Sequence, residues 1–438
     1  MTLLFIRYTV QQYYTQYERM VNRQKYIPIK EIDKVVIVGG GQAGGQFVKT
    51  VRSEGFSGEV VLIGDEGHRP YERPPLSKSG LSSDADASAA VSYLFDAEAL
   101  RKLDVKQEQR RVAAIDRVSR TVTCQDGWST GYDGLVLATG GRAVTLAVSD
   151  PLAAAVRTLR TIEDARALRE RFDASQAITV IGGGWLGLEV ASAARRRGLQ
   201  VVLIESGMRL CGRVVPPMLS GYLARLHQQQ GVQLRLGVGV VAISGEPGRI
   251  ALTLSNGEKL EAHTIFVGVG MVPNDELAGA AGLEVDRGIV TDASGRTSDP
   301  RVFACGDVAT FHHPLIGRRV RLESWANAQN QATACARAFL GLEPSPVELP
   351  WFWSNQYDNS IQIAGLPPLD ASIVVRGDPQ SSSFSFFSFV DERLAGAVAV
   401  NADRDVRIAK RLIEAGIPVD AMLLRDPSIN LQKLLVRS

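Results

Sequence analysis

Two glycine clusters in the chain have the spacing that binds the phosphates of a dinucleotide. They are Gly39, Gly41 and Gly44, and then Gly182, Gly184 and Gly187. In such a G-x-G-x-x-G pattern the first glycine permits a tight turn and the second lets the backbone approach a pyrophosphate. The third allows a helix to pack closely on a strand. The sequence therefore predicts two dinucleotide-binding sites.

An acidic residue follows each cluster at the end of the next strand-like run. These residues are Asp65 and Glu205, and a carboxylate at that point accepts hydrogen bonds from ribose hydroxyls. Glu205 would repel the 2′-phosphate of NADPH, so we expect the second site to bind NADH. The nearby Arg209 and Arg213 leave open the alternative that a 2′-phosphate finds a partner there.

The elements that must hold these residues repeat along the chain. KVVIV leads through the first glycine cluster and a helix-length segment to EVVLI, and AITVI leads in the same way to QVVLIE. Each is one βαβ unit, and each is followed by a hairpin and a further strand. We therefore expect an α/β protein with two Rossmann-like nucleotide-binding domains.

The C-terminal part has a different pattern. SIQIAGL, ASIVVRG and SFSFFSFV alternate as antiparallel strands, and RDVRIAKRLIEAG is typical of a helix. This predicts a smaller α+β domain, in which Phe384, Phe386 and Phe389 share one buried strand face. The predicted boundaries are a poorly ordered leader at 1–33, a first nucleotide-binding domain at 34–150 and 275–345, a second, NADH-binding domain at 151–274, and a C-terminal domain at 346–438.

Composition excludes several classes of protein. The net charge of +2, from 49 basic and 47 acidic residues, is too small to favour nucleic acid as a partner. The four cysteines are far apart and form no C-x-x-C pair, so neither a disulfide framework nor a metal site is expected. Because no apolar run approaches the roughly 20 residues that span a bilayer, we expect a soluble, cytoplasmic protein.

Six further motifs resemble one family of flavoenzymes. They are RPYERPPLSK (69–78), ATGGR (138–142), GGGWLGLE (182–189), RTSDPRVFACGDVA (296–309), LESWANAQNQA (322–332) and PWFWSNQYD (350–358). From residue 34 to the C-terminus the chain resembles the FAD-dependent ferredoxin reductases that serve Rieske-type aromatic-ring dioxygenases and bacterial cytochrome P450 systems. The resemblance implies a glutathione-reductase-type fold, FAD in the first site, and electron flow from NADH to a [2Fe-2S] ferredoxin in aromatic hydrocarbon catabolism.

The same resemblance implies roles for individual residues. Lys78, Glu189 and Trp325 would be catalytic: Lys78 and Trp325 at the flavin ring, and Glu189 orienting the nicotinamide. Trp185 would shield the ring until nicotinamide displaces it. The other implied FAD contacts are Ala43, Asp65, Arg73, Val112, Thr139, Gly140, Arg142, Gly306 and Asp307, and those of NADH include Leu186 and Gly270. Structural interpretations remain open for several of them: a solvated Lys78, Asp307 as a cap, and core packing for the tryptophans.

The position of the cysteines bears on where electrons go. Disulfide reductases of this fold need cysteine early in the first domain, and this chain has none before Cys124. We therefore expect electrons to pass from flavin directly to an external carrier, with Cys305 as a packed residue. Alternatives on the same scaffold are an NADH oxidase, a rubredoxin or monodehydroascorbate-type reductase, and a redox-sensing flavoprotein of the apoptosis-inducing-factor type.

The carrier and the assembly are also predicted. An acidic ferredoxin would need a local basic surface, and the predicted C-terminal helix offers one face of basic residues. This face consists of Arg404, Arg407, Lys410 and Arg411. A solvated helix face is the interpretation that we favour for these four residues. We expect a monomer or a weak homodimer.

Overall fold

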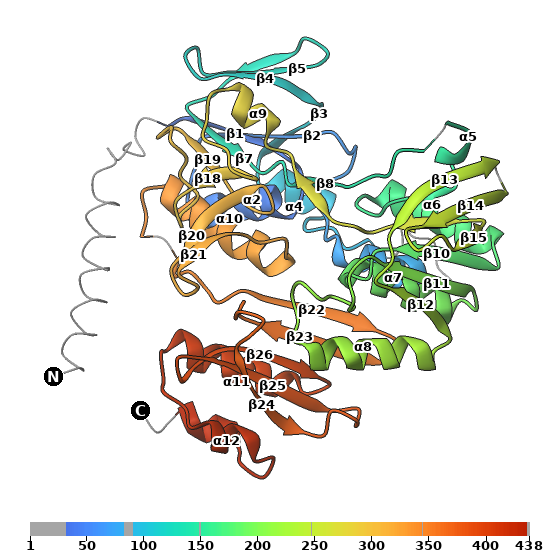
Figure 1. Cartoon of the computed structure of the whole chain (residues 1–438). Coiled ribbons are helices and arrows are strands. Elements are labelled where there is room, and N and C mark those ends of the chain that lie inside the picture. Colours follow the sequence, from blue (N-terminus) through green and yellow to red (C-terminus); the bar gives the residue numbers. More distant parts are fainter. Residues whose placement is uncertain (1–31, 83–90, 149, 247, 344, 436–438) are drawn as a thin grey trace.

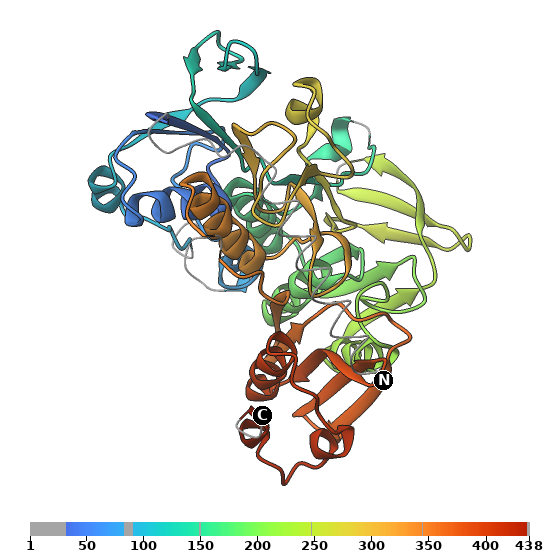
Figure 2. The same ribbon diagram turned by 90° about the vertical axis from the view of Figure 1, so that its left-hand side faces the viewer.

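The computed structural model describes residues 32–82, 91–148, 150–246, 248–343 and 345–435 (Figure 1). The predicted N-terminal leader therefore lies almost wholly outside the described residues. Figures 1 and 2 show two α/β parts side by side, with the C-terminal part beneath them. None of the described helices is long and apolar enough to cross a lipid bilayer.

The first part is built on a five-stranded parallel sheet that contains the first glycine cluster. Its strands, in spatial order, are β19 (Val302–Ala304), β7 (Gly134–Leu137), β1 (Lys34–Val38), β2 (Glu59–Gly64) and β3 (Val105–Gln109). Helices α2 (Gln42–Ser53) and α10 (Trp325–Phe339) cover one face. Strand β19 follows the second unit in sequence, so the chain returns to complete the first sheet.

The second part repeats this architecture around the second glycine cluster. Its parallel sheet has the order β12 (Val232–Leu236), β11 (Gln200–Glu205), β10 (Ala177–Ile181), β16 (Ile265–Val267) and β9 (Val156–Arg157). Its helices are α6 (Ile162–Ala174), α7 (Trp185–Arg196) and α8 (Pro217–Gln229). The two βαβ units predicted from sequence are thereby confirmed.

Small sheets accompany both parts, and their strands pair antiparallel in every case but one. The predicted hairpins are β5 (Thr121–Cys124) with β6 (Ser129–Gly131) before β7, and β14 (Arg249–Leu254) with β15 (Lys259–Ala262) before β16. Two strands, β8 (Gly141–Ala143) and β17 (Met271–Pro273), pair where the chain passes between the parts. The remaining small-sheet strands are β4 (Val112–Asp116), β13 (Val240–Glu246), β18 (Ile289–Thr291), β20 (Ala309–His313) and β21 (Arg318–Arg321).

The C-terminal part is an antiparallel sheet followed by a helix, as predicted. Its strands are β22 (Trp351–Gln356), β23 (Asn359–Ala364), β26 (Arg393–Val400), β25 (Phe384–Val390) and β24 (Ser372–Gly377), in spatial order. Helices α11 (Asp403–Glu414) and α12 (Ala421–Arg425) cover one face, and α8 of the second part packs on the other. The α/β and α+β fold class predicted from the sequence is confirmed.

One detail of this sheet was predicted wrongly. Phe384 and Phe386 lie in the core that faces α8, whereas Phe389 lies with Phe387 in the core that faces α11. Successive side chains of a strand point to opposite faces. The three phenylalanines therefore cannot share one face, and both faces of β25 are buried.

Candidate functional site

A cavity of about 1410 Å³ opens between the two nucleotide-binding parts and β22. It exceeds the roughly 300–1,000 Å³ of an ordinary ligand pocket, as a dinucleotide with a second ligand beside it would require. Fifteen of the predicted site residues line it: Gly39, Gly41, Ala43, Asp65, Arg73, Lys78, Val112, Thr139, Gly140, Arg142, Trp185, Leu186, Glu189, Asp307 and Trp325.

The other predicted site residues lie away from the cavity wall. Gly44 and Gly306 are packing positions: a Cβ would lie 2.0 Å from the Gly39 carbonyl oxygen in the first case and 2.8 Å from the Ala43 Cβ in the second. The remaining five lie at or just beyond the carboxyl ends of β10, β11 and β16; they are Gly182, Gly184, Gly187, Glu205 and Gly270. These strands are neighbours, so the five gather at one edge of the second sheet.

The first glycine loop has the shape that a dinucleotide phosphate needs. Gly39 has φ +119°, and a Cβ there would lie 2.2 Å from the Ala138 carbonyl oxygen. At Gly41, by contrast, the nearest described atom to an added Cβ is Nη2 of Arg73, at 3.7 Å. Gly41 is also the N-cap of α2 and supplies no side-chain cap. The start of α2 is therefore open to an anionic group.

Gln42, the first residue of α2, gives an independent sign of a ligand. Its side chain is buried and lines the cavity, yet neither its amide oxygen nor its amide nitrogen has a hydrogen-bond partner among the described residues. A buried polar group without a partner costs roughly 1–3 kcal/mol. A phosphate or hydroxyl of bound FAD would satisfy this amide, so the residues present fit the predicted cofactor.

The second glycine loop has the same shape. Gly182 has φ +108°, and a Cβ there would lie 2.4 Å from the Gly268 carbonyl oxygen, whereas a Cβ at Gly184 would meet no described atom within 4 Å. The Glu205 carboxylate accepts hydrogen bonds from the backbone N–H groups of Gly183 (2.7 Å) and Gly207 (2.6 Å). It is thereby held at the end of β11, where an adenine ribose would lie.

The arginines near Glu205 differ in their freedom to bind a phosphate. Arg209 donates to the carbonyl oxygens of Val215 and Gly212 and to the Ser220 hydroxyl. Arg213 is exposed. Because Arg209 is already bound by its own loop, a 2′-phosphate would depend on Arg213 beside a fixed carboxylate. This geometry favours NADH.

A lysine–glutamate pair joins the two nucleotide-binding parts at the cavity wall. Lys78 follows the short helix η2 (Pro74–Ser77), and its Nζ lies 2.9 Å from Oε1 of Glu189 on α7. The Ser77 hydroxyl lies 2.5 Å from the other carboxylate oxygen. Glu189 is only 7% exposed, and Lys78 is 20% exposed. Lys78 is thus an anchored cation that faces the cavity and is not a solvated side chain.

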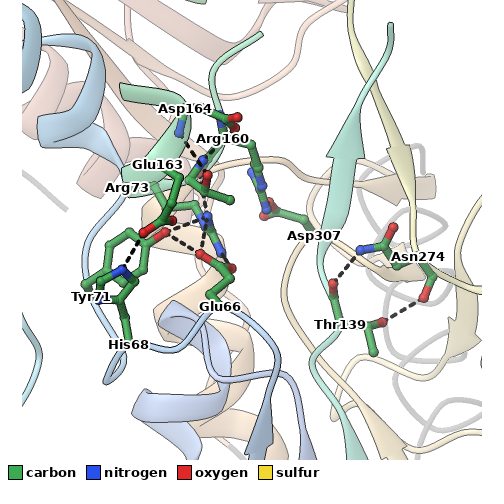
Figure 3. Close-up of polar contacts among 11 residues, drawn as sticks. Glu66, His68, Tyr71, Arg73, Thr139, Arg160, Glu163, Asp164, Asn274 and Asp307 are labelled. Carbon is green, nitrogen blue, oxygen red and sulfur yellow. Dashed lines mark hydrogen bonds and ion pairs between the residues drawn. The ribbon is translucent and has the colours of Figure 1, made fainter. Parts of the chain in front are cut away.

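Arg73 is held by a cluster of polar groups beside the same cavity (Figure 3). Its guanidinium lies 2.5 Å from Glu66, donates to the Arg160 carbonyl at 2.5 Å and to the Tyr71 hydroxyl at 3.1 Å. Burial alone would lower the pKa of Arg73, but the ion pair with Glu66 outweighs it and raises that pKa. Arg73 therefore places a permanent positive charge next to the first glycine loop.

Asp307 and an arginine that was not predicted form a second pair in the wall (Figure 3). Nη2 of Arg160 lies 2.8 Å from the Asp307 carboxylate. The predicted Arg142 instead pairs with Glu276 at 2.6 Å and donates to Asn274 at 3.1 Å. Of the two arginines, only Arg160 contacts Asp307, a residue predicted to bind FAD. Its only local signal was its place directly before the capped helix α6.

The crossing segments between the parts are tied together close to this pair (Figure 3). The Thr139 hydroxyl donates to the Asn274 carbonyl at 2.7 Å, and the Asn274 amide donates to the Thr139 carbonyl at 2.9 Å. Both residues line the cavity. These reciprocal hydrogen bonds hold together the two segments of the chain that pass between the first and second sheets.

Aromatic rings close the side of the cavity that faces β22. Trp185 packs edge-on against Phe352 with centroids 5.0 Å apart, and Trp325 packs edge-on against Trp353 at 5.6 Å. Trp351 stacks on Trp353 at 5.1 Å. Phe352 and Trp353 both line the cavity, so β22 contributes to the site as well as to the C-terminal sheet.

The cysteines and the basic helix occupy other positions. All four cysteines are free and buried, and only Cys305 of the four lines the cavity. On α11, Lys410 is bound by Glu348 (2.8 Å) and Glu414 (2.7 Å), while Arg404, Arg407 and Arg411 are exposed. No residue of α11 lines the cavity, and this favours the solvated-face interpretation.

Comparison with known proteins agrees with this geometry. The chain is 39% identical over 407 residues to the anthranilate 1,2-dioxygenase system ferredoxin–NAD(+) reductase component of Burkholderia cepacia, covering 92% of this chain and 99% of that one. It is 39% identical to rhodocoxin reductase of Rhodococcus erythropolis, covering 92% and 94%. The crystal structure of the covalent putidaredoxin reductase–putidaredoxin complex matches with a TM-score of 0.88 at 37% identity, covering 92% and 98%.

Two family models together account for most of the chain. Residues 351–435 match the reductase C-terminal family, which corresponds to the antiparallel sheet and its helices. Residues 33–332 match the model described as pyridine nucleotide-disulphide oxidoreductase, which spans both glycine loops and most of the cavity wall. The chain belongs to the pyridine nucleotide-disulphide oxidoreductase family.

Proposed function

We propose that the chain is an NADH-dependent ferredoxin reductase that carries FAD. FAD would lie along the first glycine loop with its ring near Lys78, and NADH would enter from the second loop. The domain boundaries follow from this: 34–150 with 275–345 for FAD, 151–274 for NADH, and 346–438 as the C-terminal domain. The partner is a [2Fe-2S] ferredoxin, and the protein acts as a monomer or weak homodimer in the cytoplasm.

One observation carries the proposal. The same cavity is lined by the loop that suits a flavin dinucleotide and by Trp185, Leu186 and Glu189, which begin the helix of the second loop. Two dinucleotides bound at the two loops would therefore bring their reactive ends into one space. Holding two reactants in contact is the main contribution that a protein makes to a transfer between cofactors.

The chemistry of the cofactor determines what the side chains must do. Bound FAD converts a two-electron hydride donor into a supply for a one-electron carrier. Lys78, held by Glu189, would place a cation where negative charge develops. Trp185 would cover the site until nicotinamide enters. Disulfide reductases of this fold carry cysteine early in the first domain, whereas this chain has none before Cys124, and its four cysteines are free and buried. This supports an external acceptor.

The activities named for the relatives support the choice of acceptor. They describe ferredoxin–NAD(+) reductase components of dioxygenase systems, and one solved relative is joined to putidaredoxin. We infer the same class of partner for this chain, and an oxygenase as the final consumer of electrons.

Anaerobic mixing of the holoprotein with NADH tests the proposal. We expect rapid bleaching of the flavin by NADH, slower bleaching by NADPH, and no dimerisation on reduction. Slow bleaching accompanied by dimerisation would instead favour a redox-sensing flavoprotein. In a separate aerobic assay, rapid oxygen consumption with NADH alone would favour an oxidase.

A further inference from the structure

Four hydrogen bonds, three buried and one partly buried, link five polar side chains and end on Glu189. We call this set the buried chain; its members are Tyr357, His227, Gln356, Ser354 and Glu189. The distances are 3.2 Å from Tyr357 Oη to His227 Nδ1, 2.9 Å from His227 Nε2 to Gln356 Oε1, 3.1 Å from Gln356 Nε2 to Ser354 Oγ, and 2.7 Å from Ser354 Oγ to Glu189 Oε1. His227, Gln356 and Ser354 have no exposed surface.

Every hydrogen bond of the buried chain has its donor on the Tyr357 side and its acceptor on the Glu189 side. An amide oxygen only accepts, so His227 must carry its hydrogen on Nε2, and its Nδ1 then accepts from the Tyr357 hydroxyl. The Gln356 amide nitrogen donates to Ser354 Oγ. The one hydrogen of the Ser354 hydroxyl is therefore left for Glu189. Burial lowers the pKa of His227 to about 4, which keeps the ring neutral, as this arrangement requires.

Three parts of the protein meet at the Glu189 carboxylate. Lys78 comes from the first nucleotide-binding part, Glu189 from the second, and Ser354 from β22 of the C-terminal sheet. Ser354 does not line the cavity, and neither do Gln356, His227 and Tyr357 behind it. Ser354 can therefore influence the site only through Glu189.

We propose that Ser354 is a positioning residue for the reaction, because its hydroxyl orients the Glu189 carboxylate that anchors Lys78 at the cavity wall. Gln356, His227 and Tyr357 hold that hydroxyl in one rotamer. The C-terminal part thereby completes the hydride-transfer site. This inference rests on the proposed NADH-to-flavin reaction.

A second buried serine in the same sheet provides a matched control. The Ser385 hydroxyl on β25 donates to the Asp405 carboxylate at 2.8 Å, and Ser385 has no exposed surface. Asp405 also pairs with Arg376 at 3.2 Å, and neither lines the cavity. The substitution Ser385→Ala thus removes an equivalent hydroxyl-to-carboxylate bond without touching Glu189.

The test is stopped-flow reduction of the flavin of each holoenzyme by NADH, with flavin content measured on the same samples. In Ser354→Ala we expect the limiting rate constant to fall about tenfold, the effect of losing one hydrogen bond to a charged group. The NADH concentration for half-maximal rate should change less than twofold, because Ser354 contacts no ligand. Gln356→Leu should lower the limiting rate in the same direction but less, and Ser385→Ala should leave it within twofold.

The outcomes separate this inference from the proposed function. If NADH bleaches the wild-type flavin and Ser354→Ala is reduced at the wild-type rate, the positioning role is wrong and the proposed function stands. A fall that Ser385→Ala reproduces would also overturn it, because a general loss of packing would then explain both. A wild-type flavin that NADH does not bleach would overturn the proposed function and this inference together.

Discussion

His227 should make the stability of the protein depend on pH in a defined window. The ring has no exposed surface and its pKa is lowered to about 4 by burial, whereas an unfolded histidine titrates near 6.5. At about 1.36 kcal/mol per pKa unit, the difference corresponds to about 3 kcal/mol. The unfolded state takes up this proton first, so the contribution is complete above pH 6.5 and is lost as pH falls toward 4.

The measurement compares wild type with His227→Gln, which cannot titrate. Free energies of unfolding from urea titrations of the two proteins between pH 7.5 and 4 would be subtracted at each pH, so that groups common to both cancel. We expect the wild type to lose its advantage over the variant by about 3 kcal/mol across the window. A difference that stays constant with pH would refute the buried, neutral His227 on which the direction of the buried chain depends.

Three further predictions concern cofactor binding. Gln42→Leu should raise the dissociation constant for FAD about tenfold. It should also raise the stability of the FAD-free protein, because it removes an amide without a partner. Equilibrium dialysis and thermal unfolding give the two values, and a less stable FAD-free variant would contradict the ligand role. Arg160→Gln should weaken flavin retention more than Arg142→Gln, because only Arg160 pairs with Asp307; flavin-to-protein ratios after gel filtration compare them, and equal ratios would count against Arg160. Glu205→Gln should raise the NADPH-to-NADH ratio of kcat/KM about tenfold or more, and an unchanged ratio would show that this carboxylate does not read the ribose.

Local patterns were sufficient to predict the nucleotide-binding parts. The β-branched strands, the glycine spacing and the following acidic residues each act within a few residues of one another, so their geometry follows from the sequence. The Gly39 and Gly182 turns both have positive φ, as the first position of the pattern requires. The face of Phe389, in contrast, was predicted wrongly although strand alternation alone decides it.

Contacts between distant segments were beyond sequence reasoning. Arg160 and Asp307 are 147 residues apart, and Ser354 and Glu189 are 165 residues apart. No local sequence pattern predicts which polar residue will have a buried hydrogen-bond partner in another part of the fold. The motif around Lys78 was recognised, but its anchoring by Glu189 appears only when η2 and α7 are placed side by side.

The most direct test of the central claim is NADH-driven cytochrome c reduction with and without a purified [2Fe-2S] ferredoxin. We expect the rate of cytochrome c reduction to be near zero without ferredoxin and to rise to saturation as ferredoxin is added, at fixed concentrations of NADH and enzyme. Cytochrome c reduction at the same rate without any ferredoxin, or oxygen consumption that ferredoxin does not affect, would contradict it.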